Sequence, residues 1–231
     1  MSILRSCLFF SLLVVCLWVA APALPQVSPG FLTPVLPAQN AGRGIGTWIT
    51  SGGAANTTTF AGVNIGAASS DRYVIVCGFI GSASSFTGMT LGGTSMTTVA
   101  STSNGTDQLI LAALNVTSGT TATLVMSYGG TGAAIFSVYT ITHSAHALTP
   151  TTATTGNPTI TVPFGSFVIG CNADVTQSGR AWTNVTQDVQ QNVSIGAIVT
   201  ASKQFTAGGS NTFNVTYSTN TPVYAWGAFA P

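Results

Sequence analysis

The alternation of apolar and polar positions along the chain predicts short β-strands. The stretch TATLVMSYG alternates regularly, with Leu124, Met126 and Tyr128 on one face and threonine, valine and serine on the other. A period of two is typical of a strand that is buried on one face. Other segments, such as RYVIVCGFI and QLILAALNV, are continuous apolar runs bounded by turn residues. Such runs indicate strands that are covered on both faces.

The same order of segments occurs twice. TTTFAGVNI, RYVIVCGFI, SFTGMTLGG, QLILAALNV, TATLVMSYG and AAIFSVYTI are followed later by TITVPF, SFVIGCNADV, AWTNVTQDV, SIGAIVTAS, NTFNVTYST and PVYAWGAFA. In this alignment Cys77 corresponds to Cys171, and Phe86 corresponds to Trp182. Six segments in one order are hard to obtain by chance. We therefore infer an internal duplication.

The pattern predicts an all-β fold with repeat halves at about residues 44–142 and 143–231. We expect a jelly-roll-like double-sheet sandwich that the two duplicated halves build together. The connection HSAHALTP lacks the length and charge of a free linker, and the continuous apolar runs suit strands covered on both sides. The alternative is two tandem Ig-like sandwiches.

The N-terminal segment, residues 1–23, has the features of a secretory signal peptide. An apolar run from Cys7 to Ala21 follows a short, positively charged start, and an A-x-A cleavage pattern ends at Ala23. An uncleaved membrane anchor and a hydrophobic arm buried in an assembly are the alternatives for this segment. Residues 24–43 are rich in proline, glycine and alanine and predict an arm or linker. The β-sandwich domain then covers residues 44–231.

Charged residues are unusually scarce. They are 4% of the chain, against about 25% in an average soluble domain. Five Lys and Arg residues do not form the basic patch that nucleic-acid binding requires. Polarity comes instead from Thr, Ser, Asn and Gly, which is typical of extracellular or virion-surface β proteins. We expect a location on a virion surface, outside the cell or at the cell surface.

Two cysteines remain once the N-terminal segment is set aside. Cys77 and Cys171 occupy equivalent places in the two repeats. In the oxidising compartment that a signal peptide implies, they are candidates for a disulfide. The alternative is that each is a small buried core residue.

The sequence contains no recognisable catalytic signature. No G-x-S-x-G motif occurs, there is no Glu, and the two histidines, His143 and His146, share one loop. We expect no enzyme activity, no cofactor and no metal site, although SNGTDQ and NADVTQSG loosely resemble calcium-binding loops. Trp182, with Arg180 beside it, is the best candidate for an exposed residue that contacts a glycan or another partner.

The segments RYVIVCGFI, FTGMTLGG, QLILAALNV and AAIFSVYTI, with their second-half counterparts, resemble a group of phage-encoded β-sandwich proteins. The resemblance covers about residues 57–231 and implies a virion role, as in decoration or fibre components. We therefore expect a non-enzymatic structural surface protein that packs against copies of itself or against a capsid or surface lattice. The alternative is a secreted carbohydrate-binding or adhesion module.

Overall fold

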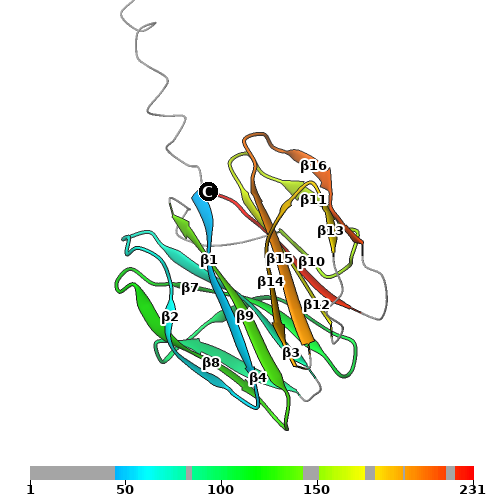
Figure 1. Cartoon of the computed structure of the whole chain (residues 1–231). Coiled ribbons are helices and arrows are strands. Elements are labelled where there is room, and N and C mark those ends of the chain that lie inside the picture. Colours follow the sequence, from blue (N-terminus) through cyan, green and yellow to red (C-terminus); the bar gives the residue numbers. More distant parts are fainter. Residues whose placement is uncertain (1–44, 82–84, 143–150, 175–179, 195, 217–221) are drawn as a thin grey trace, which may run out of the picture. The chain divides into compact units, whose positions relative to one another are not determined.

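Antiparallel strands form both halves of the chain (Figure 1). The computed structural model describes residues 45–81, 85–142, 151–174, 180–194, 196–216 and 222–231, and none of these is helical. The strands of the first half are β1 (Ile45–Ala55), β2 (Thr59–Asn64), β3 (Tyr73–Gly81), β4 (Phe86–Leu91), β5 (Thr94–Ser95), β6 (Thr97–Ser103), β7 (Gln108–Asn115), β8 (Thr121–Tyr128) and β9 (Ala133–Thr142). Those of the second half are β10 (Thr151–Ala153), β11 (Thr159–Val162), β12 (Phe167–Asp174), β13 (Ala181–Thr183), β14 (Thr186–Val193), β15 (Gly196–Gln204), β16 (Gly209–Thr212), β17 (Asn214–Thr216) and β18 (Val223–Phe229). The all-β prediction is confirmed.

Burial along the strands follows the two patterns seen in the sequence. The apolar run YVIVCGFIG forms β3, in which every residue after Tyr73 is buried. In β8, Leu124 and Met126 point into the core while Thr123 is exposed. Continuous apolar runs therefore mark strands covered on both faces, and alternation marks a strand with one outer face.

The two halves repeat one strand order. The first half has a five-stranded sheet, β1-β9-β3-β7-β6, and a four-stranded sheet, β2-β8-β4-β5. The second half has the equivalent five-stranded sheet, β10-β18-β12-β15-β14, with the two-stranded pairs β11-β16 and β13-β17 in place of the four-stranded sheet. All six pairs of aligned segments fall on equivalent strands.

Each half has the strand pairings of a jelly roll. Its first strand pairs with its last, as β1 with β9 and β10 with β18. Its second strand pairs with the strand before the last one: β2 pairs with β8, and β11 pairs with β16, which together with β17 takes the place of β8. These pairings define a double-sheet jelly roll. The predicted all-β jelly-roll sandwich is present, but each half completes its own jelly roll, whereas we expected the two halves to build one together.

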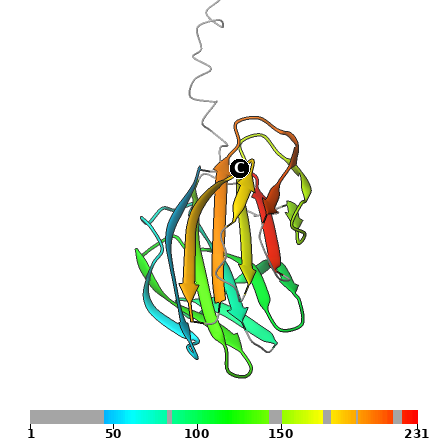
Figure 2. The same cartoon turned by 45° about the vertical axis from the view of Figure 1, so that its right-hand side comes forward.

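The halves also combine into one body, since their five-stranded sheets pack face to face (Figure 2). One hydrophobic core lies between the two sheets of the first half, and a second lies within the second half. A third core joins the halves and takes residues from both, including Leu111, Ile169 and Phe229. The five-stranded sheets are therefore buried on both faces, which explains their long apolar runs.

The contacts between the halves are nearly symmetric. Strand β9 packs against β14 and β15, and its equivalent β18 packs against β6 and β7. The contact of β1 with β14 recurs as that of β10 with β6, and β3 meets its own equivalent, β12. Each half thus offers the same face to the other, as in an isologous dimer interface.

Strand β1 was not predicted as a strand because its sequence, IGTWITSGGAA, is rich in glycine. Packing explains this composition. A Cβ on Gly46 would lie 2.0 Å from the Phe167 ring, and one on Gly52 would lie 2.7 Å from the Phe136 ring. The glycines let these rings cover the backbone of β1. The predicted N-terminal segment 1–23 and the whole predicted arm 24–43 lie outside the described residues.

Candidate functional site

Most charged side chains of the described residues are buried. Seven charged residues fall within the described ranges: Asp71, Arg72, Asp107, Asp174, Arg180, Asp188 and Lys203. Arg72, Asp107 and Asp174 are buried, and the side chain of Arg180 has no exposed surface. Among these seven, Lys203 alone is classed as exposed. The outer surface that the structure describes is therefore almost free of charge.

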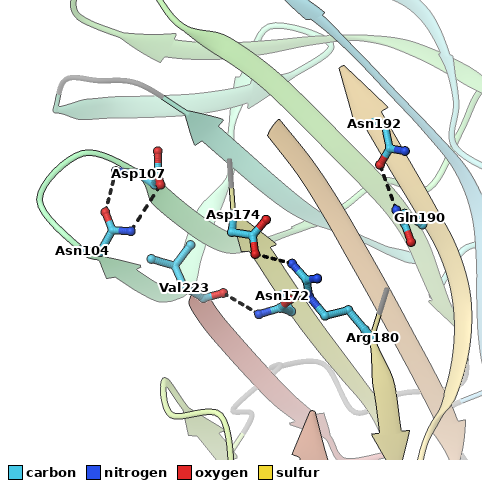
Figure 3. A network of polar contacts seen from close by, with 8 residues as sticks. All are labelled: Asn104, Asp107, Asn172, Asp174, Arg180, Gln190, Asn192 and Val223. Atoms are coloured by element: carbon cyan, nitrogen blue, oxygen red, sulfur yellow. Dashed lines mark hydrogen bonds and ion pairs between the residues drawn. The ribbon is translucent and has the colours of Figure 1, made fainter. Parts of the chain in front are cut away.

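Arg180 holds the end of β12 together (Figure 3). Its guanidinium forms an ion pair with Asp174 and also donates to the side-chain oxygen of Asn172. The amide of Asn172 in turn donates to the carbonyl of Val223 in β18. The side chain of Arg180, a candidate partner contact, is therefore covered, and its buried charge is balanced by Asp174.

Trp182, the other candidate contact residue, is half-buried in β13. Its ring meets that of Trp226 edge-on, with centroids 5.5 Å apart. Trp226 is fully buried, and its indole N–H donates to the carbonyl of Thr155 at 3.0 Å. Trp182 therefore covers the core of the second half, so it does not form an open aromatic platform for a glycan.

A disulfide joins Cys77 in β3 to Cys171 in β12, with their Cα atoms 6.4 Å apart. Both residues are fully buried in the core between the halves. Cys77 and Cys171 are equivalent positions of the repeat, so the bond lies where β3 contacts its own equivalent strand, β12. Their role is to join the two sandwiches covalently.

A buried polar network lies on one side of this interface. The Tyr139 hydroxyl donates to Asp188 at 2.7 Å, and the Ser137 and Thr200 hydroxyls are 3.1 Å apart. The indole N–H of Trp48 donates to Ser137 at 3.0 Å. These bonds connect β9 and β1 of the first half with β14 and β15 of the second. Sequence reasoning missed the network because its members are far apart in the chain and none belongs to a motif.

Burial shifts the titration of two of these groups. It raises the pKa of the Tyr139 hydroxyl well above its ordinary value, and the neighbouring Asp188 charge acts in the same direction. Burial also raises the pKa of Asp188, although hydrogen bonds from Tyr139 and Ser202 act in the opposite direction. Tyr139 is therefore a neutral donor to this carboxyl at physiological pH.

Arg72 is a buried cation that joins the loop between β2 and β3 to the loop between β7 and β8. All its donors point at main-chain carbonyl oxygens, 2.8–3.2 Å away, of Ile65, Gly66, Ala67, Val116, Ser118 and Gly119. The guanidinium has five N–H donors, so these six acceptors occupy all of them. Sequence reasoning did not single out Arg72. The available signal was a charged residue directly before the apolar run of β3.

A pocket of about 420 Å³ opens beside the loops that Arg72 holds. Its apolar lining includes Ile65, Leu91 and Val116, and its polar lining includes Thr94, Asn115 and Thr121. None of its lining residues is charged. A second hollow of about 170 Å³ shares Asn115 and adds Tyr73. No sequence motif indicated this site.

In the described part of the two suggested calcium loops, polar side chains bond to protein groups. In SNGTDQ, the Asn104 side-chain oxygen accepts the backbone N–H groups of Thr106 and Asp107, as Figure 3 shows in part. The oxygen therefore closes a turn. In NADVTQSG, Asp174 pairs with Arg180. The described residues contain no cluster of three metal-ligating side chains, and His143 and His146 lie outside them.

Comparison with protein-family models, curated proteins and solved structures finds no match to this chain. Within the described ranges, no helix long and apolar enough to cross a membrane is found.

Proposed function

We propose that this protein is a non-enzymatic structural subunit of a surface assembly. The assembly is of the virion decoration or fibre type that its segments resemble, or another extracellular assembly. The subunit packs against copies of itself. The observation that carries this proposal is the nearly uncharged surface of a body built from two joined sandwiches.

The physical argument rests on the cost of desolvation. Burying a charged side chain in an interface is expensive unless it finds a partner. A surface of Thr, Ser, Asn and Gly avoids this cost, and it also lacks the long-range repulsion that keeps charged proteins apart. A rigid subunit also favours association, because it loses little conformational freedom when it binds.

The disulfide supports a location outside the cytoplasm. Buried disulfides persist in oxidising compartments, and Cys77–Cys171 is buried between the halves. Together with the signal-like N-terminal segment, this pairing supports an extracellular or particle-surface position.

Charge insertion on the outer faces tests the proposal. One double variant places Lys at Thr59 and Thr123 of the first half, and the other places Lys at Thr161 and Thr183 of the second half; all four positions are exposed. The matched controls carry Asn at the same positions. Sedimentation velocity of each protein, at low salt and over a range of concentrations, measures self-association.

We expect at least one Lys variant to associate roughly tenfold more weakly than its Asn control, because like charges would then face each other. The proposal fails if the native protein remains monomeric at every concentration. It also fails if both Lys variants associate as strongly as their controls.

A further inference from the structure

We propose that the 420 Å³ pocket of the first half binds one neutral sugar ring, either free or at the end of a glycan. This site differs from the predicted contact residues Trp182 and Arg180, which lie in the second half. It is also independent of self-association, so either proposal can stand without the other.

The lining of the pocket selects a neutral ligand. No charged side chain lines it, and the donors of nearby Arg72 are all occupied by carbonyl oxygens. An anion would therefore find no charged partner. A cation would find no carboxylate among the lining residues.

The same lining suits a molecule that presents both apolar C–H groups and many hydroxyl groups. Leu114 and Val116, both half-buried, provide an apolar surface for the C–H groups of a sugar ring. Thr94, Asn115 and Thr121 add hydroxyl and amide groups that can donate to and accept from sugar hydroxyls. The volume lies within the range of small-molecule sites, roughly 300–1,000 Å³.

Arg72 preorganises the pocket. It bonds the carbonyls of Ile65 on one loop and of Val116 and Ser118 on the other. Residues of both loops line the pocket, so the guanidinium fixes their spacing before a ligand arrives. A preformed site loses less conformational entropy on binding.

The second half carries a larger side chain at the position equivalent to Val116. The backbone N–H of Val116 donates to the Arg72 carbonyl at 3.0 Å, and the equivalent N–H of Phe205 donates to the Ser166 carbonyl at 2.8 Å. At the position of Val116 the second half therefore has Phe205, whose ring is buried against Phe213. The first half keeps a smaller side chain and places an arginine where the second half has Ser166.

The repeat supplies the test variant. Val116→Phe gives the first half the side chain that the second half accepts, and we expect the ring to fill the pocket. Val125→Phe is the matched control, because it adds the same ring on β8 at a residue that does not line the pocket. The full chain is probed by saturation-transfer NMR. The neutral probes are glucose, galactose, mannose and their methyl glycosides, and the charged probes are glucuronate and glucosamine.

We expect at least one neutral sugar to bind the native protein and the Val125→Phe control. Val116→Phe should raise its Kd by roughly tenfold or more, which corresponds to about 1.4 kcal/mol. In the native protein, the same sugar should shift the backbone amide signals of Asn115 and Thr121. Because this measurement needs no variant, it tests the site even if Val116→Phe disturbs the fold.

Any one of the following results would overturn the proposal. The first is that no neutral sugar binds, and the second is that a charged sugar binds better than its neutral counterparts. The third is a neutral sugar that binds without shifting the signals of Asn115 and Thr121. The fourth is that a well-folded Val116→Phe variant binds the sugar as tightly as the native protein does.

Discussion

Replacing Cys77 and Cys171 together by alanine breaks the covalent link between the two sandwiches. The bond joins residues 94 positions apart, so it closes a long loop in the unfolded chain. In the chain-entropy account, a loop of this length stabilises the folded state by roughly 4.7 kcal/mol. Two buried sulfur atoms are also lost, at about 1 kcal/mol each on the scale of a lost methyl group.

The reduced native protein separates these two contributions. It retains both sulfur atoms and lacks the bond, so it should lose only the stabilisation that comes from closing the loop. We expect the alanine variant to lose about 7 kcal/mol of unfolding free energy and its Tm to fall by roughly 15–25 °C. The reduced protein should lie between this variant and the oxidised protein.

The assay is urea unfolding of the three forms, followed by tryptophan fluorescence and by circular dichroism. Both probes should report one transition in the oxidised protein, because the third core ties the halves together. If the alanine variant is within about 1 kcal/mol of the oxidised protein, the loop-entropy argument is refuted. Two separate transitions in the oxidised protein would show that the halves unfold independently.

Three further substitutions test particular contacts. Arg72→Lys should lower the unfolding free energy by about 3 kcal/mol or more in urea titrations, because an ammonium has three donors and cannot satisfy the six carbonyls that the guanidinium bonds; near-native stability would contradict its role as a clamp. Burial raises the pKa of Asp188 above its ordinary 3.8, so the folded state holds this proton more tightly and stability should fall as pH rises through the range above 3.8. Asp188→Asn should flatten that part of a plot of urea midpoint against pH, and an unchanged slope would count against the assignment. Gly170→Ala should cost about 1–3 kcal/mol by calorimetry, because its Cβ would lie 2.4 Å from the ring of Trp226. The control Gly88→Ala, with nothing within 4 Å, should change stability little, and equal effects would refute the packing argument.

The features that repeat along the sequence were predictable. Periodicity identified β3, β7 and β8, and the alignment of the two halves placed Cys77 opposite Cys171. The alignment could not show where the sandwiches close, because pairing between distant strands leaves no periodic signal. The complete jelly-roll order within each half therefore became visible only in the structure.

The candidate sites were harder to predict because they depend on contacts between distant residues. Nothing in the local sequence distinguishes Arg180, which is buried against Asp174, from an exposed arginine in a turn. Asp188 similarly had the appearance of a turn residue, and its partner Tyr139 lies on a strand of the other half. No strand was predicted over the glycine-rich residues of β1, whose glycines leave room for the aromatic rings that cover them.

The most direct test of the proposed function is sedimentation velocity of the native protein over a range of concentrations, at low and at high salt. Association through an uncharged surface should increase with concentration and should change little with salt, because few charges are available to be screened. A protein that remains monomeric throughout, or an association that salt abolishes, would contradict the proposal that this uncharged surface builds an assembly.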